Sequence, residues 1–166
     1  MEPSWKLTAL AVAAGSLLTA CSADDSLDYQ SDYAGHTPLH VVGYPSRGSL
    51  DVVQNAVWRL ADGDAGALAG LAVDDRSADA TARNWVDAYG TDAQGQVTAD
   101  FYDEGSTRQV VVLYFASGQV KEIEARIGED DAWGLTMDEP KPSEARAKPT
   151  WAPAQPGGSG SRSSGN

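Results

Sequence analysis

The chain has 166 residues, enough for one domain with appended segments or for two small domains. It carries 24 acidic against 12 basic residues, a formal net charge of -12. Such a surface repels nucleic-acid backbones and anionic lipid headgroups, so neither is expected as an electrostatic partner. The single cysteine excludes an intramolecular disulfide and a metal site made of cysteines alone.

Residues 1–20 have the layout of a signal peptide. Lys6 lies in a short polar head, and an apolar run follows over residues 7–18. The run is shorter than the roughly 20 apolar residues that cross a bilayer. It ends in the sequence LTAC at residues 18–21, which resembles the lipobox of bacterial lipoproteins. The alternatives are an ordinary secretory signal and an inert, buried cysteine.

The lipobox resemblance implies a specific role for Cys21. In that family the cysteine sulfur receives a lipid as a thioether, and a signal peptidase cuts before the cysteine. Several acyl chains on one residue, palmitate among them, anchor a protein firmly, whereas one chain holds only marginally. We therefore expect Cys21 to be a lipidation site, and the mature chain to lie on the extracytoplasmic face of the cell membrane.

The next segment, residues 21–45, is polar and rich in turn-forming residues, and it lacks helical or alternating periodicity. This predicts a flexible tether. His36 and His40 within it are spaced i,i+4, which on a helix would suit a metal. Pro38 lies between them and no third ligand is evident, so no metal site and no cofactor are expected.

Residues 46–138 form the predicted domain, which opens with helices. In residues 49–62 apolar side chains recur at helical spacing, with Ser49 as the expected cap and Gly63 as the expected end. A short second helix follows Asp64. A third runs from about residue 78 to residue 89 and is expected to stop at Gly90.

The second half of the domain changes to strand patterns. Residues 97–102 alternate, residues 107–115 are nearly continuously apolar, residues 119–127 alternate again, and residues 132–137 follow an acidic turn. Short turns between these strands predict an antiparallel meander. The fold class is therefore α+β, with the N-terminal helices packed on one face of a curved antiparallel sheet.

This pattern resembles the nuclear-transport-factor-2-like (cystatin-like) superfamily of cone-shaped α+β domains. The segments that carry the resemblance are DGDAGALAGLA, FASGQVKEI at residues 115–123, and Trp133 followed by Leu135. It covers about residues 50–137. In that family a strand usually follows the second helix, but here DDRSADATARN runs straight into the third. The resemblance therefore implies a shallow or open cone.

Enzymes of this superfamily place a carboxylate, or a Tyr–Asp pair, inside an apolar cone. The resemblance thus makes Asp100 and Tyr102 the candidate catalytic residues, although neither is assigned that role. Candidate pocket-lining residues are Trp85, Tyr89 and Tyr114. In the alternative interpretation, Asp100 lies on the solvent face and the aromatic side chains fill the core.

Residues 139–166 are rich in Pro, Gly and Ser, which predicts a disordered tail. Trp151 stands alone in it and is interpreted as an idle aromatic rather than a recognition motif.

Three functions remain. The first is a membrane-anchored, non-catalytic module that binds a protein partner or a small apolar ligand. The second is an isomerase- or dehydratase-type enzyme, and the third is a structural cell-envelope lipoprotein. Because related domains often dimerise through the sheet, a homodimer is a further expectation. No hydrolase, P-loop or dinucleotide-binding motif is present in the sequence.

Overall fold

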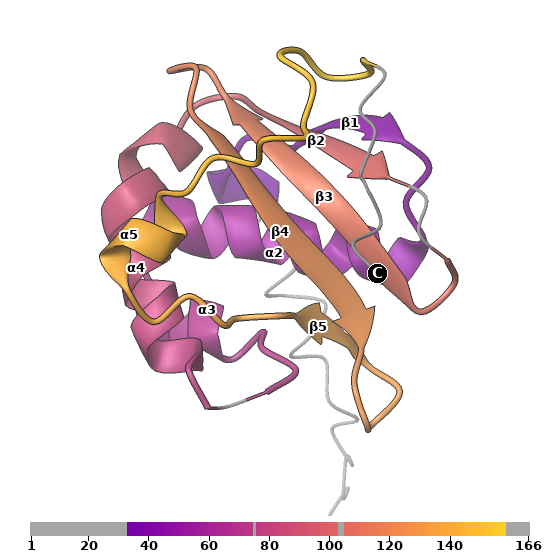
Figure 1. Ribbon diagram of the computed structural model, residues 1–166, viewed down its shortest axis with the longest axis vertical. Coiled ribbons are helices and arrows are strands. Elements are labelled where there is room, and N and C mark those ends of the chain that lie inside the picture. Colours follow the sequence, from indigo (N-terminus) through magenta and orange to yellow (C-terminus); the bar gives the residue numbers. More distant parts are fainter. Residues whose placement is uncertain (1–32, 75, 103–104, 159–166) are drawn as a thin grey trace, which may run out of the picture.

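The computed structural model describes residues 33–74, 76–102 and 105–158. The predicted signal peptide, Cys21 and the end of the tail lie outside these residues. The elements labelled in Figure 1 are β1 (His40–Gly43), α2 (Arg47–Asp62), α3 (Ala65–Ala69), α4 (Ala78–Ala93), β2 (Val97–Tyr102), β3 (Arg108–Phe115), β4 (Val120–Ile127), β5 (Trp133–Leu135) and α5 (Pro142–Ala145).

Helix α2 is capped by a side chain at its N-terminus and by a glycine at its C-terminus. The Ser46 hydroxyl accepts a hydrogen bond of 3.0 Å from the Ser49 backbone N–H, so the cap lies three residues before the expected Ser49. Gly63 ends the helix with φ 72°, a left-handed conformation that glycine adopts without strain. The periodic face of α2, with Val53 and Val57 among its members, is buried as its spacing predicts.

Helix α4 continues past its expected end at Gly90 to Ala93. The reason lies in its packing against α2. A Cβ added at Gly90 would lie 3.1 Å from the Leu60 carbonyl oxygen, so the missing side chain lets the two helices approach closely. This glycine is a packing position in the helix rather than a stop signal.

The strands form one five-stranded sheet in the order β1-β2-β3-β4-β5. The pairs from β2 to β5 are antiparallel, in the sequence order expected of a meander. Together with the helices, this establishes an α+β fold. Strand β1 pairs with β2 in parallel, with Val41 opposite Ala99, so the sheet is mixed.

The segment before the domain differs from the flexible tether expected over residues 21–45. Residues 40–43 are strand β1, and residues 33–39 pack on α2. The His36 ring stacks on Trp58 at a centroid distance of 5.3 Å, and the Leu39 N–H donates to Gln54 Oε1 at 3.1 Å. The sequence did not predict β1 because four residues are too few to show periodicity. Its pairing partner, β2, also lies far away along the chain.

The sheet separates two environments. Alternate residues of β2, β3 and β4 face the helices and form the core with α2 and α4, among them Phe101, Leu113 and Ile123. Figure 1 shows α2 behind the sheet and α4 at its left, and both ribbon views show the chain after α5 crossing the front of the sheet. Residues 139–158 are therefore packed on the domain, unlike the disordered tail expected there.

Candidate binding cleft

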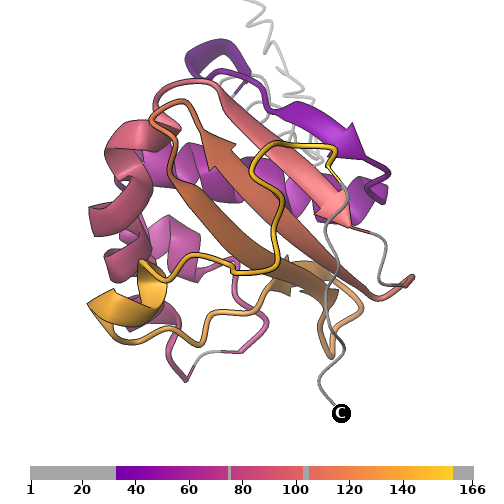
Figure 2. The same ribbon diagram turned by 45° about the horizontal axis from the view of Figure 1, so that its top comes forward.

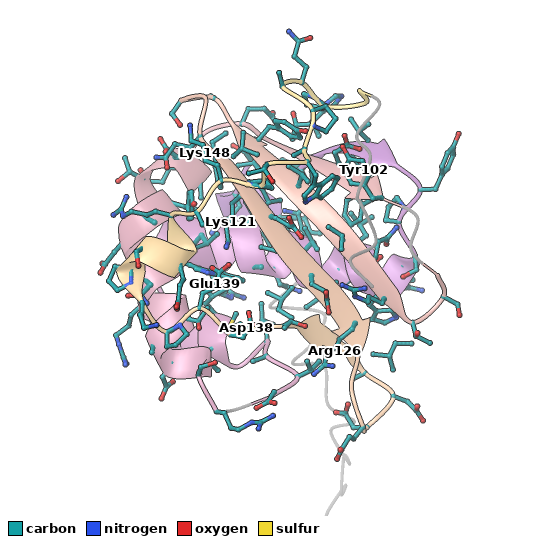
Figure 3. The ribbon with its side chains drawn as sticks, in the orientation of Figure 1. Tyr102, Lys121, Arg126, Asp138, Glu139 and Lys148 are labelled. Atoms are coloured by element: carbon teal, nitrogen blue, oxygen red, sulfur yellow. The ribbon has the colours of Figure 1, made fainter. Side chains whose placement is uncertain are left out.

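Lys121 is a buried lysine on β4 and forms an ion pair with Glu139. The residue is 2% exposed, and its Nζ donates to the two Glu139 carboxylate oxygens at 2.6 and 2.5 Å. The same Nζ lies 4.8 Å from the centroid of the Trp85 ring, within cation–π range. Figure 3 shows Lys121 beside β4 and Glu139 on the chain leading to α5.

Glu139 is held in place by helix α4. Its Oε2 accepts from Trp85 Nε1 at 2.6 Å, and its carbonyl oxygen accepts from Asn84 Nδ2 at 3.1 Å. Its backbone N–H donates to the Thr81 hydroxyl at 3.0 Å. Because Thr81, Asn84 and Trp85 follow one another at helical spacing, one face of α4 fixes the carboxylate opposite Lys121.

The environment of Lys121 shifts its titration. Burial lowers the pKa of the ammonium group, and the attraction of Glu139 opposes that effect. A buried charge is strongly disfavoured unless it is paired, so the ion pair explains why this lysine is tolerated inside the fold. Perturbed ionisable groups beside a cleft are also candidates for functional sites.

A cleft of about 340 Å³ opens at this ion pair. The cleft runs along residues 121–124 of β4. Strand β5 pairs with residues 125–127, so it does not cover this part of the β4 edge. The tail segment 147–149 lines the other side. The charged lining comprises four carboxylates and two ammonium groups: Glu122, Glu124, Asp138 and Glu139, with Lys121 and Lys148. Figure 3 labels four of these residues around the cleft.

The Glu124 carboxylate is held ionised in the wall of this cleft. Its oxygens accept from Arg108 at 2.5 Å and from the Thr136 hydroxyl at 3.1 Å. Burial acts to raise the pKa of Glu124, but these bonds outweigh it and hold the pKa below its usual value. Glu124 therefore stays ionised at neutral pH, with its charge balanced by Arg108.

The sequence-predicted residues Asp100, Tyr102 and Tyr114 come together, but on the sheet face opposite the helices. The Tyr102 hydroxyl donates to Asp100 Oδ2 at 3.1 Å. Burial and the Asp100 carboxylate both raise the pKa of Tyr102, so its phenol remains a donor. Tail residues 151–157 cover this cluster, as described below.

The other predicted lining residues lie on the helix side of the sheet. Tyr89 donates its hydroxyl to the Ala145 carbonyl at 2.8 Å and stacks on Phe115 at a centroid distance of 5.3 Å. Its ring therefore fills the core, and of the three predicted lining residues Trp85 reaches the cleft. The apolar cone with Asp100 inside, surrounded by all three aromatics, does not occur.

Sequence reasoning missed Lys121 and Glu139. One signal for Lys121 was present: it occupies the same alternating positions as Ile123 and Ala125, which face the core. A lysine at an inward position of a strand indicates a buried partner. Glu139 gave no such signal, because it lies at the start of a Pro-rich segment.

Other parts of the described chain provide weaker candidates for a functional site than the cleft at Lys121 and Glu139. A hollow of about 760 Å³ lies between residues 70–74 with Arg76 on one side and the β4–β5 turn on the other. Arg76 is paired there with Asp74 at 2.7 Å. His36 Nε2 lies 2.8 Å from Asp62 Oδ1. Among residues 33–158, apart from the gaps at 75 and 103–104, no group of three potential metal ligands occurs. No helix in this part is long and apolar enough to cross a bilayer.

Comparisons of the chain with protein-family models, curated proteins and solved structures found no match.

Proposed function

We propose that the protein is a lipoprotein anchored through Cys21 on the extracytoplasmic face of the cell membrane, with a non-catalytic binding module as its folded domain. The LTAC sequence after an apolar run supports the anchor. The module belongs, in this proposal, to the nuclear-transport-factor-2-like fold. Helices packed on one face of an antiparallel β2–β5 meander support that assignment.

The observation that carries the binding function is the cleft built on the Lys121–Glu139 ion pair. Its floor is held in place by α4, which forms one hydrogen bond to the Glu139 carboxylate and two to the Glu139 backbone. A preorganised, concave site with convergent polar groups is typical of ligand binding. Its charged lining supports a small polar ligand over the apolar ligand expected from the sequence.

Electrostatics narrows the ligand class further. The lining has two more carboxylates than ammonium groups. Arg108 neutralises one of these carboxylates, Glu124, so an excess of one negative charge remains, and the chain as a whole carries a net charge of -12. Both favour a positively charged ligand, such as a small amine or a basic side chain of a protein partner. Asp138 lies at the cleft and is exposed, so its carboxylate is available to meet the cation.

The test is calorimetric titration of the full chain, carrying Cys21→Ser, with cadaverine and with glutarate as a probe of equal length and opposite charge. We expect cadaverine to bind with an affinity that falls as salt is added, and Asp138→Asn to weaken it severalfold. Asp79→Asn, an exposed carboxylate on α4, is the matched control. Equal binding of glutarate, or no effect of Asp138→Asn, would contradict the proposal.

One observation favours a second function. The 3.1 Å contact between Tyr102 and Asp100 matches the Tyr–Asp pair of the isomerase or dehydratase alternative. Asp100 is 4% exposed beneath the tail, however, so a substrate would have to displace residues 151–157 to reach it. The binding cleft is open without such a change, which is why we place the enzyme second.

A further inference from the structure

The tail crosses the outer face of the sheet through contacts that resemble recognition of a peptide. The Tyr114 hydroxyl donates to the Pro153 carbonyl at 3.0 Å, and the Gly157 N–H donates to Asp100 Oδ2 at 2.8 Å. Two side chains of the sheet therefore bind a backbone acceptor and a backbone donor of the tail. Such pairs hold a peptide main chain in one register and direction.

Trp151 adds a side-chain anchor on the same face of the sheet. Its indole N–H donates to Glu122 Oε2 at 2.6 Å, and its ring packs edge-on against Tyr102 at a centroid distance of 4.8 Å. An indole that buries its ring and satisfies its N–H is a common anchor at interfaces. The sequence-based interpretation of Trp151 as an idle aromatic is therefore wrong.

The sheet face and the tail differ in how deeply they are buried. On the sheet, Val110 and Val112 are fully buried and point away from the helix-side core. On the tail, residues 151–153 are half-buried and residues 154–158 are exposed. A half-exposed irregular segment opens more readily than the core of a domain. Opening would leave an apolar strip flanked by acceptors for N–H groups.

We propose that this outer face is a peptide-binding surface, and that residues 150–157 are its built-in competitor. The partner is a segment of another protein that carries a tryptophan followed within two residues by a proline, as Trp151 and Pro153 are arranged here. The acceptors Asp100 and Glu122 require N–H donors and disfavour acidic segments. This surface adjoins the cleft at Glu122, which lines both, but the Lys121–Glu139 ion pair lies on the helix side of the sheet.

The intramolecular tail sets the strength of the competition. A tethered segment acts at an effective concentration in the millimolar range, so a free peptide of equal intrinsic affinity binds the wild-type chain weakly. Weakening the tail alone, without changing the sheet, must therefore strengthen binding of an added peptide. This reciprocal effect distinguishes a recognition surface from simple structural packing.

The experiment uses a fluorescein-labelled peptide, KPTWAPAQPGG, with the sequence of residues 148–158, titrated with full chains that carry Cys21→Ser. Fluorescence anisotropy compares the wild-type tail with Trp151→Ala. As a second tail variant, Gly157→Pro removes the N–H that Asp100 accepts and the positive φ of 74°. We expect both variants to bind the peptide at least about tenfold more tightly than the wild-type chain.

A third substitution tests the receiving face. In the Trp151→Ala chain, Tyr114→Phe removes the hydroxyl that donates to the Pro153 carbonyl, and we expect about fivefold weaker peptide binding. Tyr44→Phe is the matched control, because Tyr44 is 94% exposed. Circular dichroism confirms that each chain is folded. If folded tail variants fail to bind the peptide, or if Tyr114→Phe has no more effect than Tyr44→Phe, the proposal is overturned.

Discussion

Trp85 and Lys121 donate to the same oxygen atom, Oε2 of Glu139, at 2.6 and 2.5 Å. One donor comes from helix α4 and the other from strand β4, so the carboxylate joins the helical layer to the sheet at the cleft. The link is made by charge rather than by apolar packing. Its strength therefore depends on every member being present.

Removing one partner of this ion pair should destabilise the fold. We expect Glu139→Gln to lower the free energy of unfolding by about 2 kcal/mol, since Lys121 stays buried without its counter-charge. This lies below the range for fully buried pairs because the Glu139 side chain is 26% exposed. Urea unfolding measures it. Adding Lys121→Met should restore part of the loss.

The control for that experiment is the solvent-exposed pair Lys141–Glu144, whose Nζ and Oε1 lie 2.9 Å apart. We expect Lys141→Met with Glu144→Gln to leave the urea midpoint unchanged, as is usual for exposed ion pairs. An equal loss at both pairs would mean that burial of Lys121 contributes nothing to the effect.

Acid should weaken the contact between Glu124 and Arg108. The pKa of Glu124 lies below its ordinary value of 4.5 in the folded chain, so its stabilising effect is complete above pH 4.5 and is lost as the pH falls through the folded pKa. We expect Glu124→Gln to cost about 1 kcal/mol at pH 7 and less at pH 3, measured by urea unfolding.

For this pH dependence, Glu129→Gln in the exposed β4–β5 turn is the comparison variant. In this variant, the free energy of unfolding should change between pH 7 and pH 3 by the same amount as in the parent chain. A Glu124→Gln effect that is as large at pH 3 as at pH 7 would show that the carboxylate charge is not its source.

Two glycines in helices should respond in opposite directions to alanine. A Cβ at Gly48, in the first turn of α2, would overlap the Trp133 ring of β5. We expect Gly48→Ala to cost about 2 kcal/mol despite the better helix propensity of alanine. Thermal or urea unfolding provides the measurement.

Gly66 in α3 is the matched position, because an added Cβ would meet Asp64 Oδ1 at an ordinary 3.5 Å. There Gly66→Ala should stabilise the fold by up to about 1 kcal/mol through helix propensity. Equal loss of stability at both glycines would contradict the packing that we describe at Trp133.

Lipid attachment at Cys21 has a direct test in the host cell. We expect the wild-type chain to enter the detergent-rich phase on partitioning and to incorporate labelled palmitate, and Cys21→Ser to abolish both. Thr19→Ser, which keeps the cysteine, is the control and should behave as the wild type. Labelling that survives Cys21→Ser would refute the proposed anchor.

Several elements could be predicted from the sequence because their periodicity reports a buried face over many residues. The apolar spacing of α2 and the alternation of β2 and β4 are of this kind, and their positions were correct to within a few residues. Turn residues between the strands likewise indicated an antiparallel order. These are local signals, which neighbouring residues determine without reference to the rest of the chain.

The candidate site depended on contacts between distant parts of the chain. Asp100 and Tyr102 were correctly placed on one face of a strand, but which face the helices would cover was not encoded in that alternation. The cleft likewise required Glu139, far from α4 in sequence, to reach Trp85. No periodic pattern predicts such a meeting.

The sequence by itself therefore determined the acidic character, the LTAC segment, the α+β class and the course of the long elements. Only the tertiary structure decided that residues 40–43 form a strand, that Lys121 is buried against Glu139, and that the tail covers the sheet. The physical reason is that these three features rest on strand pairing, hydrogen bonds and ion pairs between distant segments. Their free energy becomes available only after the long elements have brought those segments together.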